Sequence, residues 1–206
     1  MPVGRYTVLG DDGSPLGTEA FRCAPGPMGW RYFGEIETDE PEPHREIVDL
    51  TVDASWRLVR FRVAAGEHEL VLAPQDGRLL GERDGDPLDL PWSDDHHVDY
   101  LTPAANAVTC QRLDATTEID VVYVVPATLE PTLMRQRYEL LGPDRVQTPV
   151  GAFDATRWRY TSLDEDPWTG DLWVAADVVV AYQELYELEW YEPGVTGARL
   201  AVPRNG

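Results

Sequence analysis

The sequence predicts an all-β protein, built as an antiparallel sandwich, roll or barrel. Segments with an apolar residue at about every second position run through nearly the whole chain, as expected for half-buried strands. Turns rich in glycine and proline separate many of them, and one central segment has helical character. The predicted strands are residues 5–9, 30–37, 45–52, 56–63, 69–72, 79–83, 119–125, 132–141, 145–148, 155–161, 171–175, 178–182 and 185–191.

The first half of the chain reads as strands joined by tight turns. Residues 30–37 alternate between apolar and polar side chains. The apolar residues of 56–63 do not keep one period, which predicts a β-bulge near Val59-Arg60. Asp76-Gly77 is a typical two-residue hairpin turn. A second turn is predicted over Asp84-Gly85-Asp86-Pro87.

The second half continues the pattern. Residues 132–141 have reasonable helix propensity, but from position 134 to 140 uncharged side chains alternate with charged ones. Because strict alternation is the strand period, we predict a strand here. Gly142-Pro143-Asp144 is expected to turn the chain into a separate strand over residues 145–148.

The segment from Asp94 to Leu113 interrupts the strand pattern. We predict a short helix over Pro103–Arg112, with Thr102 as its N-cap and proline in its first turn. Polar residues are set here among small apolar ones, and buried polar groups need hydrogen-bond partners. The segment is therefore either a structural network or the polar end of a binding site.

Length and composition indicate one domain. The chain has 206 residues, 43% of them hydrophobic, which is enough for a substantial core. No proline- or serine-rich linker divides it, so we predict a single domain over residues 1–206. Residues 55–58 weakly resemble residues 156–160, so a duplication that gave rise to two similar halves of the chain remains an alternative.

The charge of the chain excludes some partners. With 37 acidic and 17 basic residues the net charge is −20, which argues against binding to nucleic-acid phosphates. It also disfavours docking on anionic lipid surfaces. Every basic residue is arginine, a pattern that fits a GC-rich coding sequence or a salt-adapted surface.

Compartment is inferred from the cysteines and the N-terminal residues. Cys23 and Cys110 are expected to be free, buried thiols in a reducing cytosol. The first residues contain no apolar signal-peptide region, and no apolar run is long enough to span a bilayer. We therefore expect a cytoplasmic protein without a membrane span; the oligomeric state is left open.

The central segment and its flanks resemble a bacterial protein family named for glycolipid binding. The matching features are Asp99, then Thr102-Pro103-Ala104-Ala105-Asn106, then Arg112-Leu113. Flanking matches are Ser55-Trp56-Arg57 through Leu80-Gly81, the strand at Val121–Pro126, Leu129-Glu130-Pro131 and Gln136-Arg137-Tyr138. The resemblance covers roughly residues 45–190 and does not extend to the chain before Arg45. It implies a spiral β-roll, or half-open barrel, with a cavity for a glycolipid or another amphiphile.

The candidate ligand-binding residues come from this segment and its flanks. Asp99, Asn106 and Arg112 could coordinate one polar ligand group, since Arg donates from a planar fork and Asp and Asn accept from hydroxyls. The alternative is a buried Asp99–Arg112 pair with Asn106 capping the central turn. Tyr138 completes the candidate site within its matching motif. Trp168 lies in an acidic turn and is expected at a pocket rim.

Metal binding and catalysis are not predicted. Asp94, Asp95, His96 and His97 resemble a metal cluster, but adjacent residues of an extended segment point to opposite sides. We interpret them as a solvated acidic loop and expect no metal or cofactor. None of the serines Ser14, Ser55, Ser93 and Ser162 lies in a nucleophile elbow.

The sequence therefore favours a non-enzymatic protein that binds a glycolipid or another amphiphile in a β-roll cavity. The alternative is a structural or interaction domain whose side chains fill its own interior. A hydrolase or isomerase is a third possibility.

Overall fold

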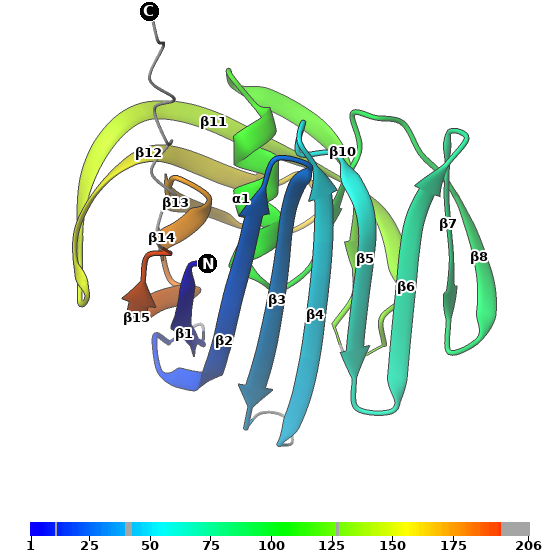
Figure 1. Cartoon of the computed structure of the whole chain (residues 1–206), viewed down its shortest axis with the longest axis horizontal. Coiled ribbons are helices and arrows are strands. Elements are labelled where there is room, and N and C mark those ends of the chain that lie inside the picture. The colour runs from blue at the N-terminus through cyan, green and yellow to red at the C-terminus, as the bar shows by residue number, and fades with distance from the viewer. Residues whose placement is uncertain (11, 40–42, 127, 195–206) are drawn as a thin grey trace, which may run out of the picture.

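The computed structural model describes residues 1–10, 12–39, 43–126 and 128–194. Within them, fifteen strands form one sheet, accompanied by the helix α1, Pro103–Arg112 (Figure 1). The strands of the first half are β1 (Val3–Leu9), β2 (Pro15–Gly26), β3 (Gly29–Thr38), β4 (His44–Asp53), β5 (Leu58–Ala65), β6 (His68–Gln75), β7 (Arg78–Arg83) and β8 (Asp86–Pro91). Those of the second half are β9 (His97–Asp99), β10 (Thr117–Val124), β11 (Pro131–Thr148), β12 (Gly151–Ser162), β13 (Thr169–Ala175), β14 (Val178–Tyr182) and β15 (Tyr186–Glu192).

The topology is two antiparallel meanders joined at the middle of the sheet. The first meander runs from β1 to β8 and the second from β10 to β15, and β1 pairs with β15. The short strand β9 pairs in parallel with β10 at the far edge. The chain between β8 and β10 must therefore cross from one edge of the sheet to the other, and this crossover carries α1.

The sheet curls around α1 without closing into a barrel. Figure 1 shows β11 and β12 arching on one side of the helix and β2 to β4 on the other. Residues Pro103 to Cys110 of α1 are all buried, because the helix lies on the concave side of the sheet. Most of the interior of the roll is thus filled by α1 and by inward-facing strand residues.

Strand alternation decides which side chains face this interior. On β4, Val48, Leu50 and Val52 are buried and alternate with more exposed residues, as the two-residue period requires. Burying a side chain of this size stabilises the fold by about 1.5–3 kcal/mol. The core joins both meanders, since Val121 and Leu172 of the second meander belong to the same cluster as Val48 of the first.

The predicted fold class is confirmed: the described chain is mostly strand, with a single helix in one open, curled sheet. The helix has the predicted bounds, and Thr102 has the extended backbone of an N-cap and accepts from the backbone N–H of Ala104 at 3.4 Å. The predicted bulge is also present. Thr51 pairs with Arg60 and Val52 with Leu58, which leaves Val59 as the extra residue.

Both predicted Asp-Gly turns are present. Asp76 and Gly77 have positive φ angles of 50° and 76°, and Asp84 and Gly85 have angles of 55° and 87°. Positive φ at both central residues is the type I′ geometry that matches strand twist. The second turn is shorter than predicted, because β8 already begins at Asp86.

The predicted turn at Gly142-Pro143-Asp144 is wrong. These residues lie inside β11, which continues to Thr148 beside β12, and the pairing shifts between Leu140 and Gly142. Gly142 has a φ of 101°. A glycine with positive φ serves a bulge as well as a turn, so the local sequence does not distinguish the two.

Three strands were not predicted: β2, β8 and β9. In β2 the inward-facing positions include the fully buried Glu19, which breaks the apolar alternation.

Both cysteines are free and buried, as predicted. In the described part of the chain, no helix has the length and apolar character needed to cross a membrane.

Candidate functional site

A pocket of about 300 Å³ lies near the N-terminal end of α1. It is formed where the crossover segment meets β10 to β12, β14 and the start of β15, so its walls come from distant parts of the chain. The lining residues are Asp99, Tyr100, Leu101, Thr102, Asn106, Tyr123, Met134, Tyr160, Ser162, Asp164, Trp168, Tyr182, Leu185 and Tyr186. We call it the tyrosine pocket.

A buried hydrogen-bond chain supports one side of the tyrosine pocket. The Asn106 side-chain amide donates to the Tyr138 hydroxyl at 2.8 Å. That hydroxyl donates to Oε1 of Gln136 at 3.4 Å, and Nε2 of Gln136 donates to the Asp99 carboxylate at 2.5 Å. All four residues are buried. The chain therefore fixes the orientation of Asp99 and Asn106 at the pocket surface.

Asp99 has a perturbed acidity. Burial raises the pKa of its carboxyl to about 6, although the hydrogen bonds from Gln136 and from the backbone of Tyr100 favour the ionised form. Removing a carboxylate from water disfavours its charged form more than these bonds stabilise it. Above this pKa, Asp99 presents a negative acceptor to the pocket.

Aromatic rings form the other side. The rings of Tyr160 and Trp168 are 5.7 Å apart, and those of Trp168 and Tyr182 are 5.9 Å apart. Trp168 precedes β13, and a side chain at Gly170 would meet its ring at 2.3 Å. The glycine thus lets the indole lie across the strand. Such faces pack well against apolar groups and sugar rings.

Exposed leucines lie at the tyrosine pocket and at a groove that adjoins it. Leu101 and Leu163 are exposed although they are large and apolar. A groove of about 450 Å³ runs beside the pocket and shares Met134 and Asp164 with it. Its other lining residues are His96, Asp120, Leu133, Arg135 and Leu163.

Two buried carboxylates hold the crossover segment from behind. Tyr100 donates a short hydrogen bond to Glu46 on β4, and Thr102 donates to Glu19 on β2 at 2.6 Å. The hydroxyl of Tyr32 also donates to Glu19 at 2.6 Å. The second oxygen of Glu19 is buried with no hydrogen-bond partner among the described residues. Burial raises the pKa of Glu19 to about 7.

The structure brings three of the five predicted residues to the pocket. Asp99, Asn106 and Trp168 line it, while Tyr138 lies directly behind Asn106. Arg112 lies elsewhere, because six residues of helix separate it from Asn106 by about 9 Å along the axis.

The predicted buried pair between Asp99 and Arg112 is wrong. Arg112 donates to the backbone carbonyls of Asp94 at 2.5 Å and His96 at 3.3 Å. It therefore ties the end of α1 to the start of the crossover. The side-chain amide of Gln136, and not Arg112, donates a hydrogen bond to the Asp99 carboxylate.

The histidines of the acidic segment have separate environments. His97 is buried and bonded to the Thr109 hydroxyl at 2.9 Å, and burial lowers its pKa to about 3. His96 stacks edge-on against Trp92. Among the described residues, no group of three or more His, Cys, Asp or Glu side chains is arranged to hold a metal ion.

Sequence reasoning missed Gln136, Glu19 and Glu46. A signal for Gln136 was available, because alternation places it on the same face of β11 as Tyr138. No local pattern marks the two glutamates, whose partners in the crossover segment, Thr102 and Tyr100, lie 83 and 54 residues away in the chain.

Comparisons with solved structures support the same fold. A DUF1089 family protein from Pseudomonas aeruginosa aligns with a TM-score of 0.60 and 22% identity, covering 84% of this chain and 93% of that one. A beta-barrel-like protein of the domain of unknown function DUF1849 from Brucella abortus aligns with a TM-score of 0.57 and 10% identity, covering 93% and 96%. At these identities the likeness concerns the fold alone.

Sequence comparison assigns the family. Among curated proteins, none matches this chain. A family model described as "Putative glycolipid-binding" matches residues 12–187, which include β2 to β14 and every residue of the tyrosine pocket. The chain belongs to this family.

Proposed function

We propose that this protein binds a glycolipid or a related amphiphile, and that it does so without catalysing a reaction. The polar head group enters the tyrosine pocket, and the apolar chain lies in the adjoining groove. The observation that carries this proposal is the order of chemistry along the site: buried acceptors and amides first, then aromatic rings, then exposed leucines.

The size of the two spaces supports this division. About 300 Å³ is at the lower end of ligand pockets, so it suits a head group better than a whole lipid. Asp99 and Asn106 can bond hydroxyls, while Trp168 offers a ring face. The groove beside Leu133 and Leu163 provides apolar contact for a chain.

The chemistry of the pocket favours binding over catalysis. Ser162 accepts a hydrogen bond from the backbone N–H of Trp168 at 2.9 Å, and no histidine is among the described residues that line the pocket. A serine without a neighbouring base is a weak nucleophile.

We further propose that residues 1–206 act as one domain and that the protein is cytoplasmic.

The test uses n-octyl β-D-glucoside below its micelle concentration, with binding followed by tryptophan fluorescence. Saturable binding is expected, and Trp168→Ala should weaken it at least tenfold. Trp190→Ala, which removes an exposed tryptophan on β15, is the matched control and should bind normally. Native mass spectrometry of the purified protein should detect a co-purifying lipid.

The alternative is a structural or interaction domain without a ligand. It is favoured by α1, whose buried residues occupy the interior of the roll. If octyl glucoside does not bind and no lipid co-purifies, this alternative replaces the proposal. Turnover of ester or glycoside substrates that requires Asp99 would overturn the non-enzymatic part.

A further inference from the structure

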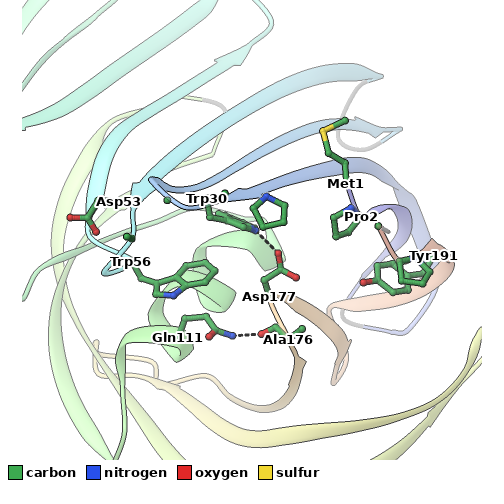
Figure 2. A pocket seen from close by; sticks show the side chains of 15 residues that line it. Met1, Pro2, Trp30, Asp53, Trp56, Gln111, Ala176, Asp177 and Tyr191 are labelled. Atoms are coloured by element: carbon green, nitrogen blue, oxygen red, sulfur yellow. Dashed lines mark hydrogen bonds between the residues drawn. The ribbon is translucent and has the colours of Figure 1, made fainter. Parts of the chain in front are cut away.

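A second pocket, of about 530 Å³, lies beside the C-terminal turn of α1. Its walls come from the turn after β4, the start of β3, the turn between β13 and β14, and the end of β15 (Figure 2). No described residue lines both this pocket and the tyrosine pocket. The two spaces are therefore separate sites at opposite ends of the helix.

Two indoles form a corner in this second pocket. The rings of Trp30 and Trp56 are 5.5 Å apart and tilted by 47°. Trp56 has a φ of 61°, in the left-handed region that a bulky residue adopts at an energetic cost. A glycine would satisfy this turn without strain. The chain instead keeps a large aromatic surface at the edge of the pocket.

Two carboxylates are held in fixed orientations beside the indoles. Asp177 accepts from the indole N–H of Trp30 at 2.7 Å, as Figure 2 shows. One oxygen of Asp53 accepts from the backbone N–H groups of Ser55 and Arg57 at 2.8 and 2.9 Å. Each carboxylate therefore keeps an oxygen that these contacts leave available.

The pocket offers acceptors and negative charge. The side-chain amide of Gln111 already donates to the carbonyl of Ala176. Among the described lining residues, none has a positively charged side chain. Met1, which carries the α-amino group, lies on the side of the pocket away from Trp56 (Figure 2). A ligand that fits must supply positive charge and apolar surface together.

We propose that this second pocket binds a small organic cation with apolar substituents, of the quaternary ammonium class. The alkyl groups pack against the Trp30–Trp56 corner, where the ring faces attract the positive charge. Asp177 and Asp53 supply the counter-charge, and the net charge of −20 raises the local concentration of cations. Tyr191, on the other side of Asp177, adds an aromatic wall.

The test titrates the full chain with choline and with its neutral isostere 3,3-dimethyl-1-butanol. Indole N–H resonances are followed by NMR, and the Trp56 resonance is assigned by its absence in Trp56→Gly. Choline is expected to shift the Trp56 resonance and at least one other indole resonance saturably, with at least tenfold higher affinity than the isostere. Asp177→Asn and Trp56→Gly should each weaken binding at least fivefold.

Two controls keep the proposal falsifiable. Trp168→Ala alters the tyrosine pocket only and should bind choline normally, so this result does not depend on the glycolipid proposal. Thermal melts identify any variant that fails to fold, and Trp56→Gly relieves the positive φ, so it should fold. Equal affinity for choline and the isostere, an absence of saturable shifts, or unchanged binding by Asp177→Asn would overturn the proposal.

Discussion

Nε2 of Gln136 on β11 lies 2.5 Å from Oδ2 of Asp99 and donates a hydrogen bond to it. Both residues are buried, and 37 residues of chain separate them. This contact joins the end of β9 to the second meander, directly behind the tyrosine pocket. It is one of the contacts that anchor the crossover segment to the sheet, together with those of Tyr100 to Glu46 and Thr102 to Glu19.

Gln136→Met tests this anchor, since methionine keeps the volume and removes the amide. At pH 8, where Asp99 is ionised, we expect a loss of about 2–3 kcal/mol in the free energy of unfolding, because a buried carboxylate loses a donor. At pH 5 the loss should be smaller, because the pKa of Asp99 is about 6 and the group is then neutral. Urea denaturation at both pH values measures this, with the exposed Gln75→Ala as control. Equal losses at both pH values would contradict the charge argument.

Tyr138→Phe distinguishes a supporting role from ligand contact. The hydroxyl accepts from Asn106 and donates to Gln136, so its removal leaves a buried amide unsatisfied. We expect a destabilisation of about 1–3 kcal/mol, with octyl glucoside affinity within threefold of the native value. Tyr123→Phe is the control for stability, because its hydroxyl has no hydrogen-bond partner among the described residues. A stable variant that loses octyl glucoside binding would make Tyr138 a direct ligand contact.

Arg112→Ala should destabilise the protein by about 1–3 kcal/mol. Its guanidinium donates to two backbone carbonyls, and charged donors of this kind contribute about that much. The loss should stay below the 3–5 kcal/mol expected when a buried carboxylate is left uncompensated. The exposed Arg145→Ala serves as control and should change stability by less than about 0.5 kcal/mol. Chemical denaturation measures both variants, and a larger loss for Arg112→Ala would indicate a partner other than these carbonyls.

Glu19 predicts an unusual dependence of stability on pH. Its pKa is raised from 4.5 in the unfolded chain to about 7 in the fold, so the folded state holds its proton more tightly. The stabilisation is fully present below pH 4.5 and is lost as pH rises through 7. The loss amounts to about 3 kcal/mol for a shift of this size.

Glu19→Gln mimics the protonated side chain and removes this dependence. Between pH 5 and 8, the free energy of unfolding of Glu19→Gln should fall less than that of the native protein. Glu37→Gln, an exposed change on β3, should keep the native slope. Parallel slopes for native protein and Glu19→Gln would mean that other groups govern this range. Asp99 acts in the same direction up to about pH 6, whereas His97, whose pKa is lowered from 6.5 to about 3, acts in the opposite direction until the unfolded histidine is neutral. Both groups are present in Glu19→Gln, so the difference between the two slopes isolates Glu19.

The net charge predicts a dependence of the melting temperature on salt. Although exposed ion pairs such as Arg31–Asp49 and Arg135–Glu118 use arginines, 37 acidic residues exceed 17 basic ones. Screening their repulsion over a Debye length of about 8–10 Å should raise the melting temperature. We expect most of the gain between a few millimolar and roughly 0.5 M NaCl, measured by thermal melts. Continued gain into molar KCl would favour salt adaptation, and a flat or falling curve would contradict the prediction.

Features that depend on neighbouring residues were predictable from the sequence. Alternation marked most strands, Asp-Gly marked two turns, and Thr102-Pro103 marked the start of α1. These signals are local because backbone period, φ preference and capping act over a few residues. The family motif likewise pointed to the segment that lines the tyrosine pocket.

Only the tertiary structure decided which groups meet. The sequence did not predict that Glu19 is a buried residue of β2. A buried carboxylate needs hydrogen-bond donors, and its donors Tyr32 and Thr102 come close to it only after folding. Gly142 could serve a turn or a bulge, and the length of β12 beside it selected the bulge. The partner of Asp99 proved to be Gln136, because the crossover from β8 to β10 brings β9 to the edge of the second meander. Sequence determines the local conformations, whereas buried polar groups take the partners that the crossover places within hydrogen-bond distance.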